Sequence, residues 1–119
     1  MLGTGVVFEV GCREWLGRYA PPGRFPDSER LGSWWSRNGR IEIDIVGTSK
    51  DRYDLLASCK WSQKAKTSAL GDLLAARDHL GGRAAYAALI IFARGFDRQL
   101  VNRAAEEDVM LVASDEQFA

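Results

Sequence analysis

An uninterrupted apolar run, Tyr-Ala-Ala-Leu-Ile-Ile-Phe, occupies positions 86–92 of this chain. A segment that is apolar at every position fits a β-strand that is buried on both faces, as in parallel sheets. Such a strand requires helices on both sides of its sheet to separate it from water. The run therefore predicts an α/β fold that contains a strand at about 84–93.

The rest of the sequence alternates between helical and strand periodicity. The predicted elements are a helix at 3–19, strands at 33–37, 40–47 and 54–61, a helix at 68–80, a strand at 84–93, a helix at 97–107 and a strand at 109–113. This α-β-β-β-α-β-α-β order predicts a mixed central sheet flanked by helices, completed by a right-handed β-α-β crossover. A length of 119 residues suits one domain, residues 1–119. A capping box at 114–117 fits two interpretations equally well, a domain that is part of a longer polypeptide and an ordinary frayed chain end.

The first two predicted strands form a hairpin. Asn38-Gly39 between them is a strong signal for a type I′ turn. The second strand alternates strictly, which places apolar and polar residues on opposite faces. The apolar face carries Ile41, Ile43 and Ile45, and the polar face carries Arg40, Glu42 and Asp44.

Composition excludes several kinds of chemistry. His79 is the only histidine, so zinc sites with two or three histidines are excluded. Cys12 and Cys59 lie far apart, which leaves no C-x-x-C motif and favours a reducing, cytoplasmic compartment. The 16 Lys and Arg residues balance 16 Asp and Glu residues, so binding of polyanions through bulk charge is not expected. Catalysis would then depend on carboxylates and lysine.

No segment predicts a membrane span or an ATP site. No apolar run approaches the roughly 18–20 residues that cross a bilayer. The pair Gly81-Gly82 lacks the spacing of a phosphate-binding loop and is expected to end the preceding helix. We therefore expect no membrane partner and no nucleotide site of the Walker A type.

Three polar side chains are expected to converge in this fold. Asp44 and Lys60 lie on neighbouring strands, and a matching register would bring both onto one face. Glu9 lies at the rim of the apolar arc of the first helix, so a helix that covers that face would add Glu9. Two carboxylates and a lysine suit phosphodiester hydrolysis, with Mg²⁺ held by the carboxylates and a water oriented by the lysine.

Four segments together resemble the PD-(D/E)XK nuclease superfamily. They are Val-Phe-Glu-Val-Gly-Cys-Arg-Glu-Trp-Leu at 7–16, Trp-Trp at 34–35, Glu-Ile-Asp-Ile-Val at 42–46 and Cys-Lys-Trp at 59–61. The chain is most similar to the nuclease-like C-terminal domain of a group of prokaryotic AAA+ ATPases. This resemblance implies a restriction-endonuclease-like fold, Asp44 and Glu9 as Mg²⁺ ligands and Lys60 as the water-orienting residue. It also implies DNA and the ATPase domain of the same polypeptide as partners.

The third strand departs from the family pattern. The family typically has Glu-Cys-Lys-Trp, whereas this chain has Ser-Cys-Lys-Trp at 58–61. Ser58 shares a face with Lys60, where the second metal-binding carboxylate of the family would point. A neutral hydroxyl is a poor ligand for Mg²⁺. Glu42, two residues before Asp44 on the same strand, could replace the lost ligand at the edge of the site.

Two functions follow from these residues. The first is a nuclease-like domain that is degenerate at Ser58 and serves DNA binding or regulation beside an ATPase domain. The alternative is an active Mg²⁺-dependent DNA endonuclease that uses Asp44, Glu9 and Lys60. The choice between a monomer and a homo-oligomer stays open at this point.

The same residues also have ordinary structural interpretations. Glu9 and Lys60 could be surface residues, and Asp44 and Glu42 could pair with arginines across the hairpin turn. Trp34, Trp35 and Trp61 could stack on bases, but a hydrophobic cluster in or over the sheet is favoured. His79 is expected to be exposed in the last turn of its helix, and Cys59 to be an inert core thiol. A group of basic residues follows the third strand, namely Lys60, Lys64 and Lys66.

Overall fold

The computed structural model describes residues 4–18, 20–21, 23–60 and 64–113. The elements in chain order are α1 (Thr4–Arg18), β1 (Arg30–Trp35), β2 (Glu42–Ser49), β3 (Arg52–Lys60), α2 (Thr67–Leu80), the short 3-10 helix η1 (Gly81–Ala84), β4 (Ala88–Ala93), α3 (Arg98–Glu107) and β5 (Val109–Ala113). Apart from η1, this is the predicted order. Trp61 and the predicted capping box at 114–117 lie outside the described residues. No helix in the described part is both long enough and apolar enough to cross a bilayer.

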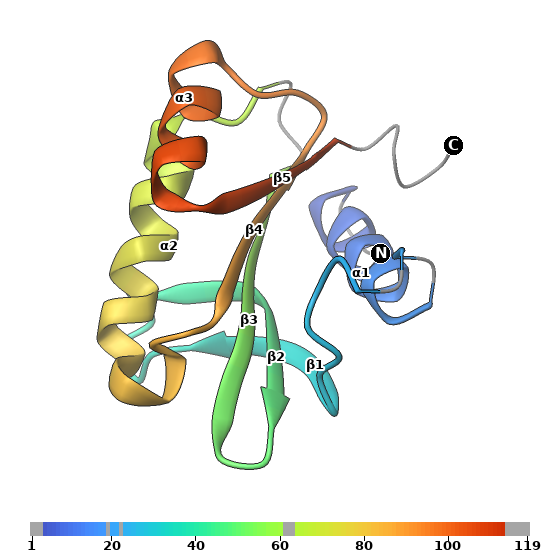
Figure 1. The fold of residues 1–119 in the computed structure, drawn as a ribbon, viewed down its shortest axis with the longest axis vertical. Helices are drawn as coiled ribbons and strands as arrows, with labels where there is room; N and C mark the ends of the chain where they lie inside the picture. Colours follow the sequence, from blue (N-terminus) through green and yellow to red (C-terminus); the bar gives the residue numbers. More distant parts are fainter. Residues whose placement is uncertain (1–3, 19, 22, 61–63, 114–119) are drawn as a thin grey trace.

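The five strands form one mixed sheet in the order β1-β2-β3-β4-β5. β1, β2 and β3 pair antiparallel, whereas β3, β4 and β5 pair parallel. α2 and α3 lie on one side of the sheet and α1 lies on the other (Figure 1). The α/β fold with a mixed sheet and flanking helices is therefore confirmed.

β4 contributes to two hydrophobic cores, one on each face of the sheet. Leu89 and Ile91 belong to the core on the α2 side, and Ile90 and Phe92 belong to the core on the α1 side. This alternation confirms that the apolar run forms a strand with both faces buried. The buried part is shorter than the run itself, because Tyr86 precedes the strand and is 94% exposed.

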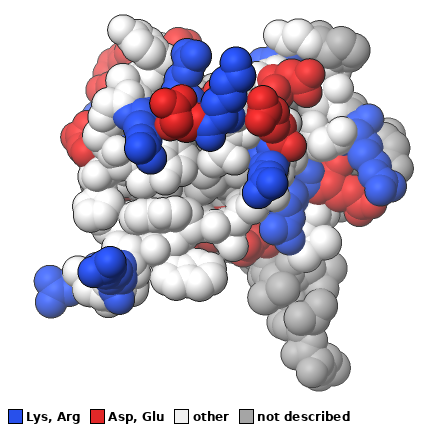
Figure 2. All heavy atoms as spheres, turned by 90° about the horizontal axis from the view of Figure 1, so that it is seen from below, with Lys and Arg blue, Asp and Glu red and all other residues white. Residues whose placement is uncertain are grey.

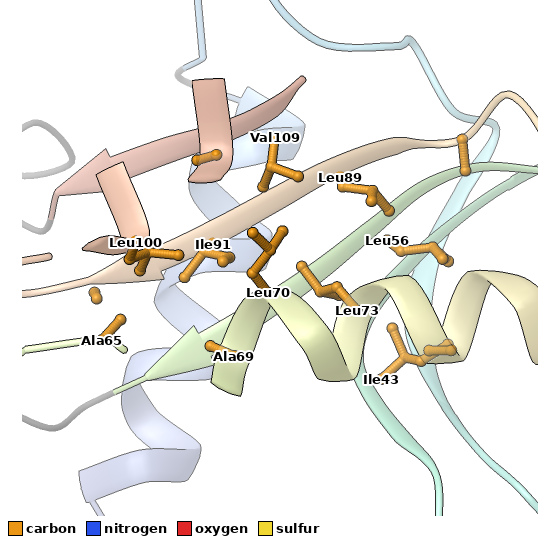
Figure 3. Packing of buried hydrophobic residues seen from close by; sticks show 14 of the residues in the cluster. Ile43, Leu56, Ala65, Ala69, Leu70, Leu73, Leu89, Ile91, Leu100 and Val109 are labelled. Carbon is orange, nitrogen blue, oxygen red and sulfur yellow. The ribbon is translucent and has the colours of Figure 1, made fainter. Parts of the chain in front are cut away.

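Each core is closed by one helical layer. Figure 3 shows Leu70 and Leu73 of α2 among the side chains of the sheet on one side. On the other side, Phe8, Cys12 and Trp15 of α1 belong to the second core. The ring of Trp15 meets that of Phe92 edge to face, with centroids 5.9 Å apart. The periodic apolar arc of each helix thus determines which side of that helix faces the sheet.

The connection between β1 and β2 corrects the predicted type I′ turn. That turn requires a positive φ at both central residues, but of Asn38 and Gly39 only Gly39 has one, at 71°. The N–H of Gly39 donates to the carbonyl of Ser36 at 2.9 Å, and the side-chain oxygen of Asn38 accepts from the N–H of Arg40 at 3.0 Å. Asn38 therefore lies in a longer loop. β1 ends at Trp35 and β2 begins at Glu42, so neither strand reaches the predicted two-residue turn.

We expect Leu70→Ala to lower the free energy of unfolding by about 2–5 kcal/mol, because it leaves a cavity in a close-packed core. Leu70 is 1% exposed and contacts the core between α2 and the sheet. Urea denaturation measures the change. Val101→Ala, at an α3 position that is 46% exposed, is the control and should change stability by less than about 0.5 kcal/mol. Equal effects of the two substitutions would contradict the packing of α2.

Candidate functional site

Asp44 lies at an irregularity in the pairing of β1 with β2. The register shifts by one residue between Gly32 and Trp34, so Asp44 and Ile45 stand opposite the single residue Ser33. This is a β-bulge, which inserts one residue into a strand and turns the side chains near it. Bulges of this kind are frequent beside functional sites.

The bulge corrects the predicted strict alternation of the second strand. Ile43 belongs to the core on the α2 side, and Ile41 packs against that core. Ile45 belongs instead to the core on the α1 side. The extra residue reverses, from Asp44 onward, the face of the sheet to which successive side chains point. Asp44 therefore does not belong to a regular polar face of β2.

The carboxylate of Asp44 accepts a hydrogen bond from the backbone N–H of Cys59, at 2.7 Å. Burial raises the pKa of Asp44, and this effect outweighs the hydrogen bond from Cys59 and the charge of Lys60, which both lower it. The nearby charge of Glu42 raises the pKa of Asp44 further. The hydrogen bond fixes the carboxylate beside β3, within the electrostatic range of Lys60.

A cavity of about 450 Å³ opens where β2 and β3 meet α2. Asp44, Ser58 and Lys60 all line it, so the structure brings these three predicted positions together. Its full lining is Arg40, Ile41, Glu42, Ile43, Asp44, Ala57, Ser58, Lys60, Asp72, Leu73, Ala75 and Ala76. Below, we call it the Asp44 cavity. Its volume is in the range of small-ligand sites, and both charge signs are present in its wall.

Glu9 approaches this region from the other side of the sheet. α1 covers the face that carries Leu55 and Ala57, not the face of Lys60 as the sequence suggests. Burial raises the pKa of the half-buried Glu9, and the charges of Asp44 and Glu42 raise it further. Glu9 therefore lies within electrostatic range of Asp44, although it does not line the Asp44 cavity.

The acidic residues near Asp44 are spread out. Within residues 4–18, 20–21, 23–60 and 64–113, no three His, Cys, Asp or Glu side chains are close enough to hold one metal ion. Glu42 is exposed, and Ser58 supplies only a hydroxyl. Mg²⁺ is usually held by one or two carboxylates together with water molecules, and the hydroxyl of Ser58 adds no negative charge to that of Asp44.

Asp72 of α2 is a further acid of the Asp44 cavity that the sequence analysis missed. A signal for it existed in the helical pattern. Asp72 lies four residues before the buried Ala76 and three after the buried Ala69, so it flanks the apolar arc of α2. Glu9 occupies the corresponding position at the rim of the apolar arc of α1, which is why the sequence pattern predicts Glu9 as a site residue.

The aromatic residues of β1 separate into two environments. Trp34 packs against the core on the α2 side, and its ring lies 5.7 Å from the ring of His79. Trp35, by contrast, is 64% exposed. His79 is exposed in the last turn of α2, as predicted, but its contact with Trp34 was not anticipated. The predicted cluster therefore includes Trp34 and leaves out Trp35.

The two cysteines meet beneath the site. A hydrogen bond between the thiols of Cys59 and Cys12, together with burial, raises the pKa of Cys59. Both residues belong to the packing on the α1 side of the sheet. The high pKa keeps the Cys59 thiol protonated at neutral pH, which agrees with the prediction of an inert core thiol.

The fold and the cavity define a class of protein: a mixed α/β domain with a lysine and several carboxylates at one end of its sheet. The chain belongs to the DUF234 family, archaea bacterial proteins of unknown function, whose sequence model matches residues 4–70. That match spans α1 to the start of α2 and includes Glu9, Asp44, Ser58 and Lys60. Comparisons with curated proteins and with solved structures gave no match.

We expect Glu9→Gln to raise the free energy of unfolding at pH 7 by about 0.5 kcal/mol, a small gain because solvent screens this partly exposed group. The raised pKa of Glu9 means that its ionised form costs stability in the folded state. The gain should shrink as the pH falls through the folded pKa. It should vanish below the ordinary value of 4.5, where the wild-type carboxyl is protonated in both states.

Glu14→Gln on the same helix is the matched control. Glu14 forms an exposed ion pair with Arg18 at 3.6 Å, so its replacement should give no gain in stability at pH 7. Urea denaturation from about pH 3 to about pH 8 measures both variants. If Glu9→Gln and the wild type have the same pH profile of stability, the electrostatic environment assigned to Glu9 is wrong.

Proposed function

We propose that this chain is a PD-(D/E)XK nuclease-like domain that is degenerate at Ser58 and serves DNA binding or regulation beside an ATPase domain. The motifs at 7–16, 34–35, 42–46 and 59–61 support the assignment to this superfamily and the attachment to an ATPase. The mixed sheet with helices on both sides is compatible with that fold. Because fold does not imply function, the proposed function rests on the residues of the Asp44 cavity.

The observation that carries the proposal is the shared wall of the Asp44 cavity. Asp44 is fixed by the N–H of Cys59 and lies within electrostatic range of Lys60, while Ser58 stands in the same wall. These are the positions at which a nuclease of this superfamily has two acids and a lysine. One acid and the lysine are present, and a hydroxyl replaces the other acid.

Mg²⁺ would polarise a phosphodiester and activate water in such a site. The described residues do not fit this ion well, because Ser58 offers a neutral hydroxyl where the superfamily has its second acid. Loss of an anionic ligand lowers metal affinity by more than the roughly 10- to 100-fold cost of losing a group that only supports a ligand. We therefore assign no cleavage step to the chain and attribute a phosphate-binding role to Lys60.

We expect Ser58→Glu to gain Mg²⁺-dependent nicking of supercoiled plasmid DNA, because it restores an acid beside Lys60. The wild type should give no nicking under the same conditions. Agarose-gel electrophoresis after incubation with millimolar Mg²⁺ or Mn²⁺ measures the conversion to open circles.

Ser58→Gln is the matched control, since it has the size of glutamate but no charge and should remain inactive. Adding Asp44→Asn to Ser58→Glu should abolish the gained activity. Nicking by the wild type would favour the alternative of an active endonuclease. No nicking by well-folded Ser58→Glu would show that the site is misplaced.

A further inference from the structure

A second cavity adjoins the Asp44 cavity and shares Lys60 with it. It has a volume of about 270 Å³ and lies between the end of β3 and the start of α2. It is lined by Lys60, Lys64, Ala65, Lys66, Ser68 and Ala69. We call it the lysine cavity, because its described lining includes three ammonium groups and no carboxylate.

The backbone that carries two of these lysines is held in place by hydrogen bonds. The N–H of Ala65 donates to the carbonyl of Gly95 at 2.9 Å, and the carbonyl of Ala65 accepts from the N–H of Asp97 at 3.1 Å. Ala65 is 2% exposed and belongs to the core on the α2 side. In such an extended segment, Lys64 and Lys66 point to the side opposite Ala65. Both lysines are therefore presented to solvent from a fixed backbone.

The charge of this cavity stands out against that of the chain as a whole. Acidic and basic residues are equal in number, 16 of each. On the face shown in Figure 2, Lys and Arg side chains lie among Asp and Glu side chains. In the described part of the chain, no ion pair joins Lys64 or Lys66 to a carboxylate. The lysine cavity is thus a local site of uncompensated positive charge.

The Asp44 cavity has the opposite character. Glu42, Asp44 and Asp72 oppose the two cations in its wall, Arg40 and Lys60. A phosphate there meets repulsion from carboxylates of the same wall as well as attraction, whereas the described wall of the lysine cavity contains cations and no carboxylate. Successive phosphates of one nucleic-acid strand could occupy adjacent sites on the two sides of Lys60.

We propose that the lysine cavity binds a backbone phosphate of DNA next to the phosphodiester that approaches Lys60. This inference rests on the proposed function and adds the location of a phosphate-binding subsite to it. Lys64 and Lys66 provide the charge, and Lys60 joins the two sites. The contact is with the DNA backbone, so it is independent of base sequence.

The test compares binding of a fluorescein-labelled DNA duplex by the wild type, Lys64→Gln/Lys66→Gln and Lys50→Gln. Lys50 is the control, because it lies in the β2–β3 turn, at the other end of these strands from Glu42 and Lys60. Fluorescence anisotropy at several salt concentrations gives the slope of log affinity against log salt. Thermal denaturation confirms that each variant is folded.

Loss of one phosphate contact lowers the salt slope by about 0.9 for duplex DNA, so the double variant, which loses the phosphate of the lysine cavity, should lose about 0.9. Between about 50 and about 200 mM salt, the wild type should then lose about three- to fourfold more affinity than the double variant. Lys50→Gln should keep the wild-type slope. Unlabelled polyaspartate of equal charge should compete much more weakly than unlabelled DNA.

The outcomes separate this inference from the proposed function. If the wild type binds DNA and the double variant keeps the full slope, the lysine cavity is not a phosphate site, while DNA binding stands. If polyaspartate competes as well as DNA, the cavity is a general anion site and the assignment to DNA is wrong. If the wild type does not bind DNA at all, this inference and the DNA-binding form of the proposed function both fail.

Discussion

Burial of β3 and β4 on both faces is the constraint on which the rest of the structure depends. These strands are apolar toward both sides, so α1 has to cover one face while α2 and α3 cover the other. Polar side chains near the sheet can then reach water only where this cover ends. Glu9 approaches that place from α1 and Asp72 from α2, while Asp44 and Lys60 come from the strands. The collection of charges around the Asp44 cavity is therefore a consequence of two-sided burial.

The bulge in β2 converts this collection into a defined geometry. An extra residue interrupts the pairing with β1 at Asp44, and the pairing of β2 with β3 ends at Ile45 and Ala57, so backbone groups of β3 beyond Ala57 need other hydrogen-bond partners. The Asp44 carboxylate supplies one for the N–H of Cys59. Side chain and backbone stabilise each other here, since the carboxylate satisfies a backbone donor and the donor orients the carboxylate. Asp44 keeps a fixed place although burial opposes its charge.

The spacing of apolar residues within each segment predicted the features of the fold that depend on that segment alone. The apolar run of β4, the alternation of β3 and the helical arcs gave the order of elements and both cores. The bulge could not be predicted, because Ile41, Ile43 and Ile45 alternate strictly and only pairing with β1 reveals the extra residue. The side covered by α1 likewise depends on which core its apolar arc joins. Asp72 could have been predicted from its position at the rim of the apolar arc of α2. That Lys60 lines both cavities depends on tertiary packing and could not be predicted.

Under the proposed function, the serine at position 58 would affect DNA cleavage and DNA binding in opposite directions. Without a metal ion, each carboxylate beside Lys60 partly neutralises the ammonium and repels a phosphate. A nuclease can tolerate two such carboxylates because a bound cation reverses their effect on the substrate. A hydroxyl at Ser58 weakens metal binding but also removes one negative charge from the wall that contains Lys60. Under the proposed function, a serine at this position therefore favours a domain that holds a nucleic-acid backbone with lysines alone, and the proposed phosphate site in the lysine cavity would extend the same metal-free mode of recognition.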